Sequence, residues 1–212
     1  MNTKYRDFID SFLYTVLAIL GGIVILFLSV TRAGYELMAN DNNENKLRNN
    51  LIEFTYLDDS GEKQEYSYLL PTTSTLPNNP FYGFKKVRDY LWLKFSQGEI
   101  NKCKTAFLLA DKKMTEGKML MELGETKIAI EASQEALEKL KYAKSIIPDD
   151  EKFRVEADYI RDQVYMAGLA YESIVKKIQL SFEDESAAKN LLEKNLNEFN
   201  QENKKERKEA TI

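Results

Sequence analysis

The stretch ADKKMTEGKMLMELGETKIAIEASQEAL, residues 110–137, carries the signals that decide the fold. Small and apolar residues recur on both sides of Gly124 at steps of three and four, which is the spacing of one helix face. Gly124 is a typical residue for a helix end, and a connection this short joins antiparallel helices. The sequence therefore predicts a helical hairpin from about Ile100 to Ile146. Its expected inner residues are Cys103, Phe107, Ala110, Met114, Gly117, Met121, Ala129, Ala132, Ala136, Leu140 and Ala143.

The small residues of this hairpin are placed as in a tetratricopeptide repeat. With Ala110 as the first position, four small-residue positions of that unit of about 34 residues are matched. Lys113 stands where the repeat has a large aromatic residue, and no second or third copy is visible for stacking. We therefore expect one tetratricopeptide-like hairpin inside a bundle. The matched positions are Gly117, Gly124, Ala129 and Ala136.

The most regular helix pattern follows Pro148. Acidic residues come directly after this proline, as they do at helix starts. Apolar residues then alternate by four and three from Phe153 to Ile178, which gives a heptad-like seam. The seam is either the inner face of a bundle or an intermolecular coiled coil, and the preceding helices, which need a partner, favour the bundle. A weaker helix is indicated by Leu191, Leu192, Leu196 and Phe199.

Upstream of the hairpin, LPNNPFYGFKKVRDYLWLKF covers residues 76–95. Asn78 or Asn79 before Pro80 is typical of a helix start. The spacing predicts one apolar face directed to the core, made of Phe84, Val87, Leu91 and Phe95. Aromatic and basic residues of the same segment form our candidate interaction surface, for anionic lipid or an acidic polymer; packing of the aromatic rings and a solvated basic face are the alternatives. This surface comprises Phe81, Tyr82, Lys85, Arg88 and Trp92.

A short β-hairpin is predicted before this segment. Apolar residues alternate from Ile52 to Tyr56 and again from Tyr66 to Leu70, on both sides of the turn sequence DDSGE. An isolated hairpin is only marginally stable. It therefore leans on the helical body or is only partly ordered.

The first part of the chain contains a run of 21 residues without charge, between Asp10 and Arg32. As a helix this run spans roughly 31 Å, close to the thickness of the bilayer interior. It exceeds the apolar part of a cleaved signal peptide, and Ser29-Val30-Thr31 is a poor cleavage site. We expect a transmembrane anchor at 11–31. The basic residues on its two sides nearly balance, and the short head favours a body outside the cytoplasm.

Composition argues against several classes of activity. The net charge of −4 does not suit a general nucleic-acid binder. The chain has no histidine and one cysteine, Cys103, which we expect to be buried; these exclude an internal disulfide and the commonest zinc sites. Acidic pairs at 149–150 and 183–185 lie where helices start or break, so capping explains them better than catalysis. We expect no enzymatic activity, no cofactor and no metal.

The order LLP, then LPNNPFYGFKKVRDYLWLKF, then AFLLADKKMTEGKMLMELGETKIAIEASQEALEKL resembles the bacterial family called domain of unknown function 5667. The resemblance covers about residues 69–143. Its strongest part is the pattern from Leu76 to Lys85, followed by Arg88-Asp89. The resemblance implies an N-terminal signal or anchor and an extracytoplasmic helical body. It brings no catalytic residues.

The expected fold class is all-α, with a small β-hairpin. The expected order is a head at 1–10, the anchor at 11–31, a flexible tether at 32–50, the β-hairpin and a Pro-rich approach at 51–79, a helical bundle at 80–200 and a disordered charged tail at 201–212.

The expected function is a single-pass membrane-anchored, non-enzymatic helical scaffold or binding module at the bacterial cell envelope. Its partners are membrane lipid, through residues 11–31, and a protein or envelope polymer. One alternative is a membrane-bound regulatory protein with a cytoplasmic helical body that signals through a protein partner. The other is a hydrolase that uses paired carboxylates.

Overall fold

The computed structural model describes residues 50–57, 61–73, 75–178 and 183–210. These residues belong to one compact unit, Leu47–Ile212. The predicted head, the anchor and the tether up to residue 49 lie outside the described residues. None of the described helices combines the length and the apolar character needed to cross a membrane. The described part is mostly helical with a two-stranded sheet, which confirms a helical bundle and the β-hairpin.

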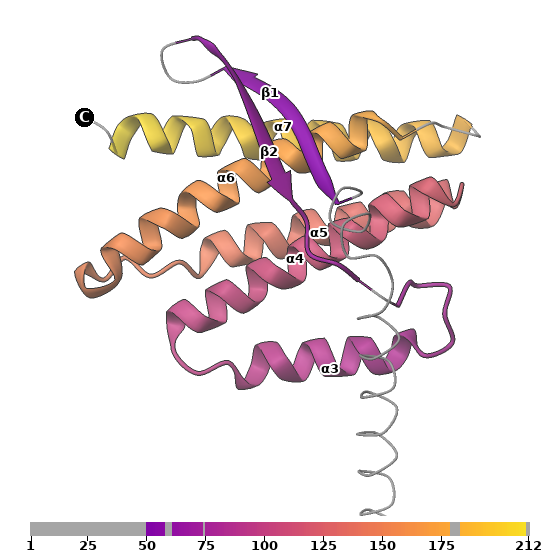
Figure 1. Ribbon diagram of the computed structural model, residues 1–212, viewed down its shortest axis with the longest axis horizontal. Coiled ribbons are helices and arrows are strands. Elements are labelled where there is room, and N and C mark those ends of the chain that lie inside the picture. The colour runs from indigo at the N-terminus through magenta and orange to yellow at the C-terminus, as the bar shows by residue number, and fades with distance from the viewer. Residues whose placement is uncertain (1–49, 58–60, 74, 179–182, 211–212) are drawn as a thin grey trace, which may run out of the picture. The chain divides into compact units, whose positions relative to one another are not determined.

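The predicted helical hairpin is confirmed as α4 (Glu99–Glu122) and α5 (Thr126–Ser145). Gly124 connects them with a φ of 78°, a left-handed conformation that favours glycine. Near one end of the hairpin, the Cys103 thiol donates to the Ala143 carbonyl oxygen at 3.3 Å. Near the other end, Gly117 lies against Ser133. The two helices are therefore antiparallel, and Figure 1 shows them side by side. Burial raises the pKa of the Cys103 thiol to about 11.

Gly117 permits the close approach of α4 to α5. A Cβ atom there would lie 2.6 Å from the Ser133 hydroxyl oxygen and 3.2 Å from the Ala129 carbonyl oxygen. We expect Gly117→Ala to lower the free energy of unfolding by about 1–2 kcal/mol, because overpacking costs about 1–3 kcal/mol and the gain in helix propensity is at most about 1 kcal/mol. Gly83→Ala is the matched control, since nothing lies within 4 Å of its Cβ position. Urea unfolding followed by far-UV circular dichroism measures both, and equal stabilities would contradict the close approach.

The seam after Pro148 is the inner face of α6 (Arg154–Lys176). A 3-10 turn, Glu151–Phe153, precedes this helix, and the Asp150 carboxylate accepts from the Lys152 backbone N–H at 3.0 Å. The seam packs against α4, α5 and α7 of the same chain, so the bundle interpretation holds. Its buried residues are Ala157, Ile160, Val164, Ala167, Tyr171, Ile174 and Ile178.

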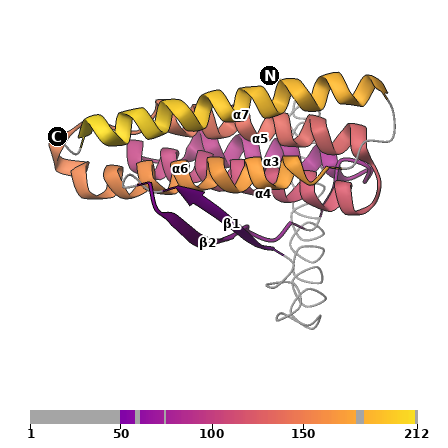
Figure 2. The ribbon, with the colours of Figure 1, turned by 90° about the horizontal axis from the view of Figure 1, so that it is seen from above.

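The last helix, α7, runs from Glu183 to Ala210, along α6 and α5 (Figure 2). Leu192, Leu196 and Phe199 are buried as predicted. The prediction of a disordered tail at 201–212 is wrong for residues 201–210, which are helical. Asn203 is buried there, and the Arg207 guanidinium lies 4.7 Å from the centre of the Tyr165 ring. Sequence periodicity misses the contact of Arg207, because it is made to a residue on α6 rather than along α7 itself.

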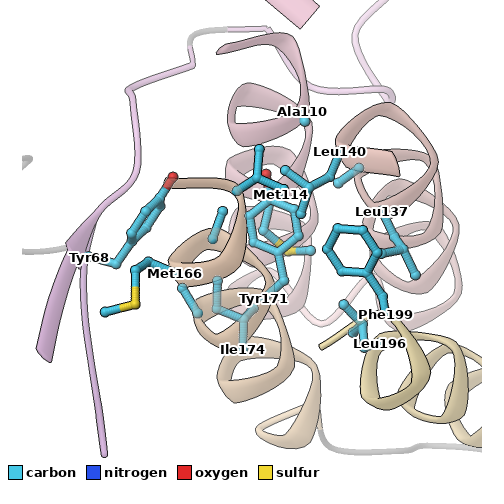
Figure 3. Packing of buried hydrophobic residues seen from close by; sticks show 14 of the residues in the cluster. Tyr68, Ala110, Met114, Leu137, Leu140, Met166, Tyr171, Ile174, Leu196 and Phe199 are labelled. Carbon is cyan, nitrogen blue, oxygen red and sulfur yellow. The ribbon is translucent and has the colours of Figure 1, made fainter. Parts of the chain in front are cut away.

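The β-hairpin consists of β1 (Leu51–Leu57) and β2 (Lys63–Leu69) in antiparallel register, with Ile52 opposite Tyr68. Ile52, Tyr68 and Leu70 are buried in the main core, and β1 contacts α6. Figure 3 shows the Tyr68 ring reaching toward the region filled by Tyr171 and Met114. The hairpin therefore leans on the helical body, as predicted.

Candidate functional site

Helix α3 (Tyr82–Phe95) lies along α4 at one edge of the described helices (Figure 1). The Asn79 side-chain oxygen accepts from the Phe81 backbone N–H at 2.9 Å. The helix begins at Tyr82 after Phe81, so Asn79 holds the turn before the helix, and the prediction that Asn78 or Asn79 caps the helix itself is wrong. Pro77 and Pro80 lie in the same approach to α3. The Pro-rich segment therefore delivers the chain to the start of the helix.

A buried polar network joins α3 to α4. The Lys85 ammonium pairs with the Glu116 carboxylate, and the two side chains are 8% and 2% exposed. The Tyr82 hydroxyl donates to the other Glu116 oxygen at 2.7 Å. Lys85 also donates to the Thr73 hydroxyl at 2.7 Å and to the Thr75 carbonyl oxygen at 3.2 Å. One lysine therefore joins the approach segment, α3 and α4.

Lys113, which is also on α4, extends this network to α5. Its ammonium lies 3.1 Å from a Glu116 oxygen and 2.9 Å from a Glu135 oxygen, and it donates to the Tyr82 hydroxyl. Desolvation alone would lower the pKa of Lys113, but the bonds to Tyr82 and Glu135 and the charge of Glu116 raise it above its usual value. Lys113 therefore stays protonated at neutral pH.

The network determines which side of α3 faces the body. Residues that follow Tyr82 at helical spacing, Lys85 and Asp89, are buried or half-buried. The opposite side, which we call the apolar stripe, is turned to the outside. The exposed fractions of its members are 70% for Phe84, 58% for Val87, 42% for Leu91 and 71% for Phe95.

The prediction that this stripe enters the core is therefore wrong. Spacing identified an apolar side correctly, but it did not identify what that side contacts. The Glu116 carboxylate is buried on α4 and binds Lys85 and Tyr82 as well as Lys113, and removing Lys85 and Tyr82 from this network would be more costly than exposing apolar carbon. The buried charge therefore sets the rotation of α3 about its axis.

The five residues of the predicted interaction surface fall into two groups. Phe81, Arg88 and Trp92 are exposed, and Lys112 places its ammonium 5.0 Å from the centre of the Trp92 ring. Tyr82 and Lys85 are turned toward α4 and take part in the buried network. The structure therefore separates the set, and the surface role of Phe81, Arg88 and Trp92 stays a prediction.

Sequence reasoning missed the partners of these residues. The available signal was Lys113, a charged residue inside the pattern of buried positions on α4. Glu116 lies three residues later and pairs with it. Burial of Lys112, followed by the nearby charge of Arg88, lowers the pKa of Lys112.

A second buried polar cluster lies where β2 meets α4 and α6. The Asp111 carboxylate accepts from the Tyr68 hydroxyl at 2.8 Å and from the Tyr171 hydroxyl at 2.8 Å. Burial raises the pKa of Asp111 to about 7, although the two hydrogen bonds act in the other direction. Burial also raises the pKa of both tyrosines, so they remain neutral donors.

Several hollows border these elements. One, of about 300 Å³, lies between α3, α4 and α5 and is lined by Tyr82, Lys113, Glu116 and Glu135, among others. Another, of about 530 Å³, lies between β1, α6 and α7. The first hollow brings together a phenol, an amine and two carboxylates, so it is the place to look for catalytic chemistry.

The acidic pairs noted in the sequence have separate structural positions. Asp150 caps the turn before α6, and Asp149 pairs with Arg161 at 2.6 Å. The side chains of residues 183–185 lie outside the described residues. Among the residues that the structure describes, no three potential His, Cys, Asp or Glu ligands gather around a common point.

Comparison with known proteins gave one match. A family model described as domain of unknown function (DUF5667) matches residues 74–211, which is more than half of the chain. The match extends beyond the stretch of resemblance at 69–143 and includes α6 and α7. No curated protein and no solved structure matches the chain.

Proposed function

The chain belongs to the family described as domain of unknown function DUF5667, and from this membership and the exposed stripe of α3 we propose that it is a membrane-anchored helical binding module without enzymatic activity. The module acts at the bacterial cell envelope, with its body outside the cytoplasm. The uncharged run at 11–31 supports the anchor. The tetratricopeptide-like character of α4 and α5 is part of this proposal.

The apolar stripe of α3 is the observation that carries the proposal. Four bulky apolar side chains are exposed on one helix face, and Phe81, Tyr90 and Trp92 are exposed beside them. Single exposed apolar residues are ordinary, but a contiguous set of this kind marks an interaction site. The buried Lys85–Glu116 pair holds the stripe outward. α3 therefore presents a binding surface on a fixed support.

The chemistry of the hollow beside α3 supports a role without catalysis. A nucleophile or general base has a pKa moved toward neutrality. Burial of Tyr82 moves its pKa upward, and the pKa of Lys113 is also raised. The phenol therefore keeps its proton and the amine keeps its charge. Both groups act as hydrogen-bond donors to Glu116, which is a structural role.

Cell fractionation followed by protease digestion tests the proposal. We expect the full chain to remain in the membrane fraction after an alkaline wash, because an uncharged helix of this length partitions into lipid. We expect protease added to spheroplasts to degrade the body. A body protected until the membrane is opened would favour the alternative, a regulatory protein that signals in the cytoplasm. Release of the full chain by the alkaline wash would contradict the anchor.

A further inference from the structure

We propose that the apolar stripe of α3 docks on the surface of an anionic lipid bilayer. This inference rests on the proposed function and names the partner of the same surface. α3 would then lie in the plane of the headgroups, with Phe84, Val87, Leu91 and Phe95 directed into the interface. Tyr82 and Lys85 would continue to hold the helix on α4.

The first argument is the distribution of apolar and polar groups around the helix. Interfacial helices bury one bulky apolar side and keep a charged side outside the lipid. α3 has such an apolar side, and it is not covered by the described part of the chain. The other side of α3 is already occupied by α4. The helix therefore has a free surface of the kind that enters a lipid interface.

The second argument is charge. Segment 78–97 carries four basic residues and one acidic residue, whereas the whole chain has a net charge of −4. Lys85 is buried against Glu116, so the exposed basic residues of the segment are Lys86, Arg88 and Lys94. Arg88 follows Phe84 by four residues and Lys94 follows Leu91 by three, so bases border the stripe on both sides. Asp89 is engaged by Arg88 at 2.7 Å. Long basic side chains at such borders reach the headgroups while their carbon chains cover apolar surface.

The charges also argue against a second copy of this chain as the occupant. In a two-fold symmetric contact the same patch meets itself. Arg88 and Lys94, which border the stripe, would then come close to the same basic residues of the other copy, and like charges across an interface oppose association. Anionic lipid has the complementary charge. An anchor at 11–31 would also hold α3 near such a surface at high effective concentration.

Fluorescence of a single tryptophan within the stripe tests the inference. Trp92 is the only tryptophan, so Phe84→Trp combined with Trp92→Phe moves the reporter to an exposed position of α3. The full chain is reconstituted in vesicles of equal parts phosphatidylcholine and phosphatidylglycerol, and in pure phosphatidylcholine. In the anionic vesicles we expect emission at shorter wavelength and quenching by lipids brominated near the headgroup. In the neutral vesicles both effects are weaker.

A charge reversal provides the matched comparison. Lys86→Glu with Lys94→Glu is expected to lower the equilibrium constant for docking by at least roughly 30-fold, because the loss of each lysine costs about 1 kcal/mol and the new carboxylates are repelled by anionic lipid. The control is Lys194→Glu with Lys205→Glu on α7, which changes the net charge equally and leaves α3 intact. Loss of quenching in the first pair and retention in the second support the inference.

Two separate readouts distinguish a failure of the membrane anchor from a failure of lipid docking by α3. Flotation of the vesicles reports the anchor, and bromine quenching reports α3. A chain that floats without quenching overturns lipid docking and leaves the anchored module in place. A shift of emission that depends on protein concentration, without bromine quenching, shows a second copy on the stripe and overturns lipid docking as well. A chain that does not float contradicts the proposed function itself.

Discussion

Glu116→Ala is expected to lower the free energy of unfolding by about 3–5 kcal/mol, the usual range when one partner of a buried ion pair is removed. Glu116 is 2% exposed and is the acceptor for Lys85, Tyr82 and Lys113. Lys113 keeps Glu135 as a partner, but Lys85 is left with two neutral oxygens. A buried ammonium without a counter-charge is the main cause of the expected loss.

The loss of stability is expected to affect α3 first, because Glu116 joins α3 to α4. Trp92 fluorescence reports the environment of α3, and far-UV circular dichroism reports all helices. We expect Trp92 of the Glu116→Ala variant to change at lower urea than the circular dichroism does. Glu122→Ala is the control, since the Lys118–Glu122 pair is on the surface and is worth less than about 1 kcal/mol. Equal loss in both variants would contradict the network as the support of α3.

The stability of the body is expected to fall as pH rises from about 4 to about 7, through Asp111. Its folded-state pKa of about 7 is above the unfolded value near 3.8. A carboxyl group with a raised pKa binds more protons in the folded state, so its full contribution is present below pH 3.8 and is lost on passing through the folded pKa. A difference of about three units between the folded-state and unfolded-state pKa corresponds to a loss of up to about 4 kcal/mol in the free energy of unfolding.

Asp111→Asn isolates this contribution, because an amide keeps an acceptor oxygen for the two tyrosine hydroxyls and does not ionise. Urea unfolding at a series of pH values measures the slope. We expect the free energy of unfolding of Asp111→Asn to increase relative to that of the original chain as pH increases. Asp158→Asn, on the exposed Asp158–Arg161 pair, is the control and should change stability by less than about 1 kcal/mol. Parallel pH profiles for the original chain and Asp111→Asn would refute this assignment.

Tyr171→Phe is expected to shift the pH range over which stability is lost through Asp111. The Tyr171 hydroxyl hydrogen-bonds the carboxylate and so lowers the pKa of Asp111 against the effect of burial. Removing this donor should raise the Asp111 pKa further, so that the loss of stability continues to higher pH. The same series of urea experiments shows the shift. A shift of this pH range to lower pH would show that the hydrogen bond does not stabilise the ionised form of Asp111.

The segment that carries the family resemblance has a structural explanation in this network. Tyr82 and Lys85 are two residues of that segment, and both bind Glu116 on the next helix. Asn79 holds the turn before them. The approach from Leu76 to Lys85 therefore docks α3 on α4 in one rotation about the helix axis.

Sequence pattern predicted the helices of the body closely. It predicted the hairpin at Gly124, the seam of α6 and the two strands around the DDSGE sequence, because each depends on residues near one another in the chain. Cys103 was correctly placed in the core. The end of α7 was missed, since Asn203 is a polar residue at a buried position and Arg207 packs on the ring of Tyr165, which is distant in the chain.

Local spacing was enough to establish which segments are helical and which side of each is apolar, since both follow from the helical repeat of about 3.6 residues. It could not establish the direction in which the apolar side of α3 points. That depended on one buried carboxylate, Glu116, 31 residues after Lys85 in the chain. The free energy of a buried charge outweighs that of a few exposed rings, so the ion pair turned Tyr82 and Lys85 inward and left Phe84 and Phe95 outside.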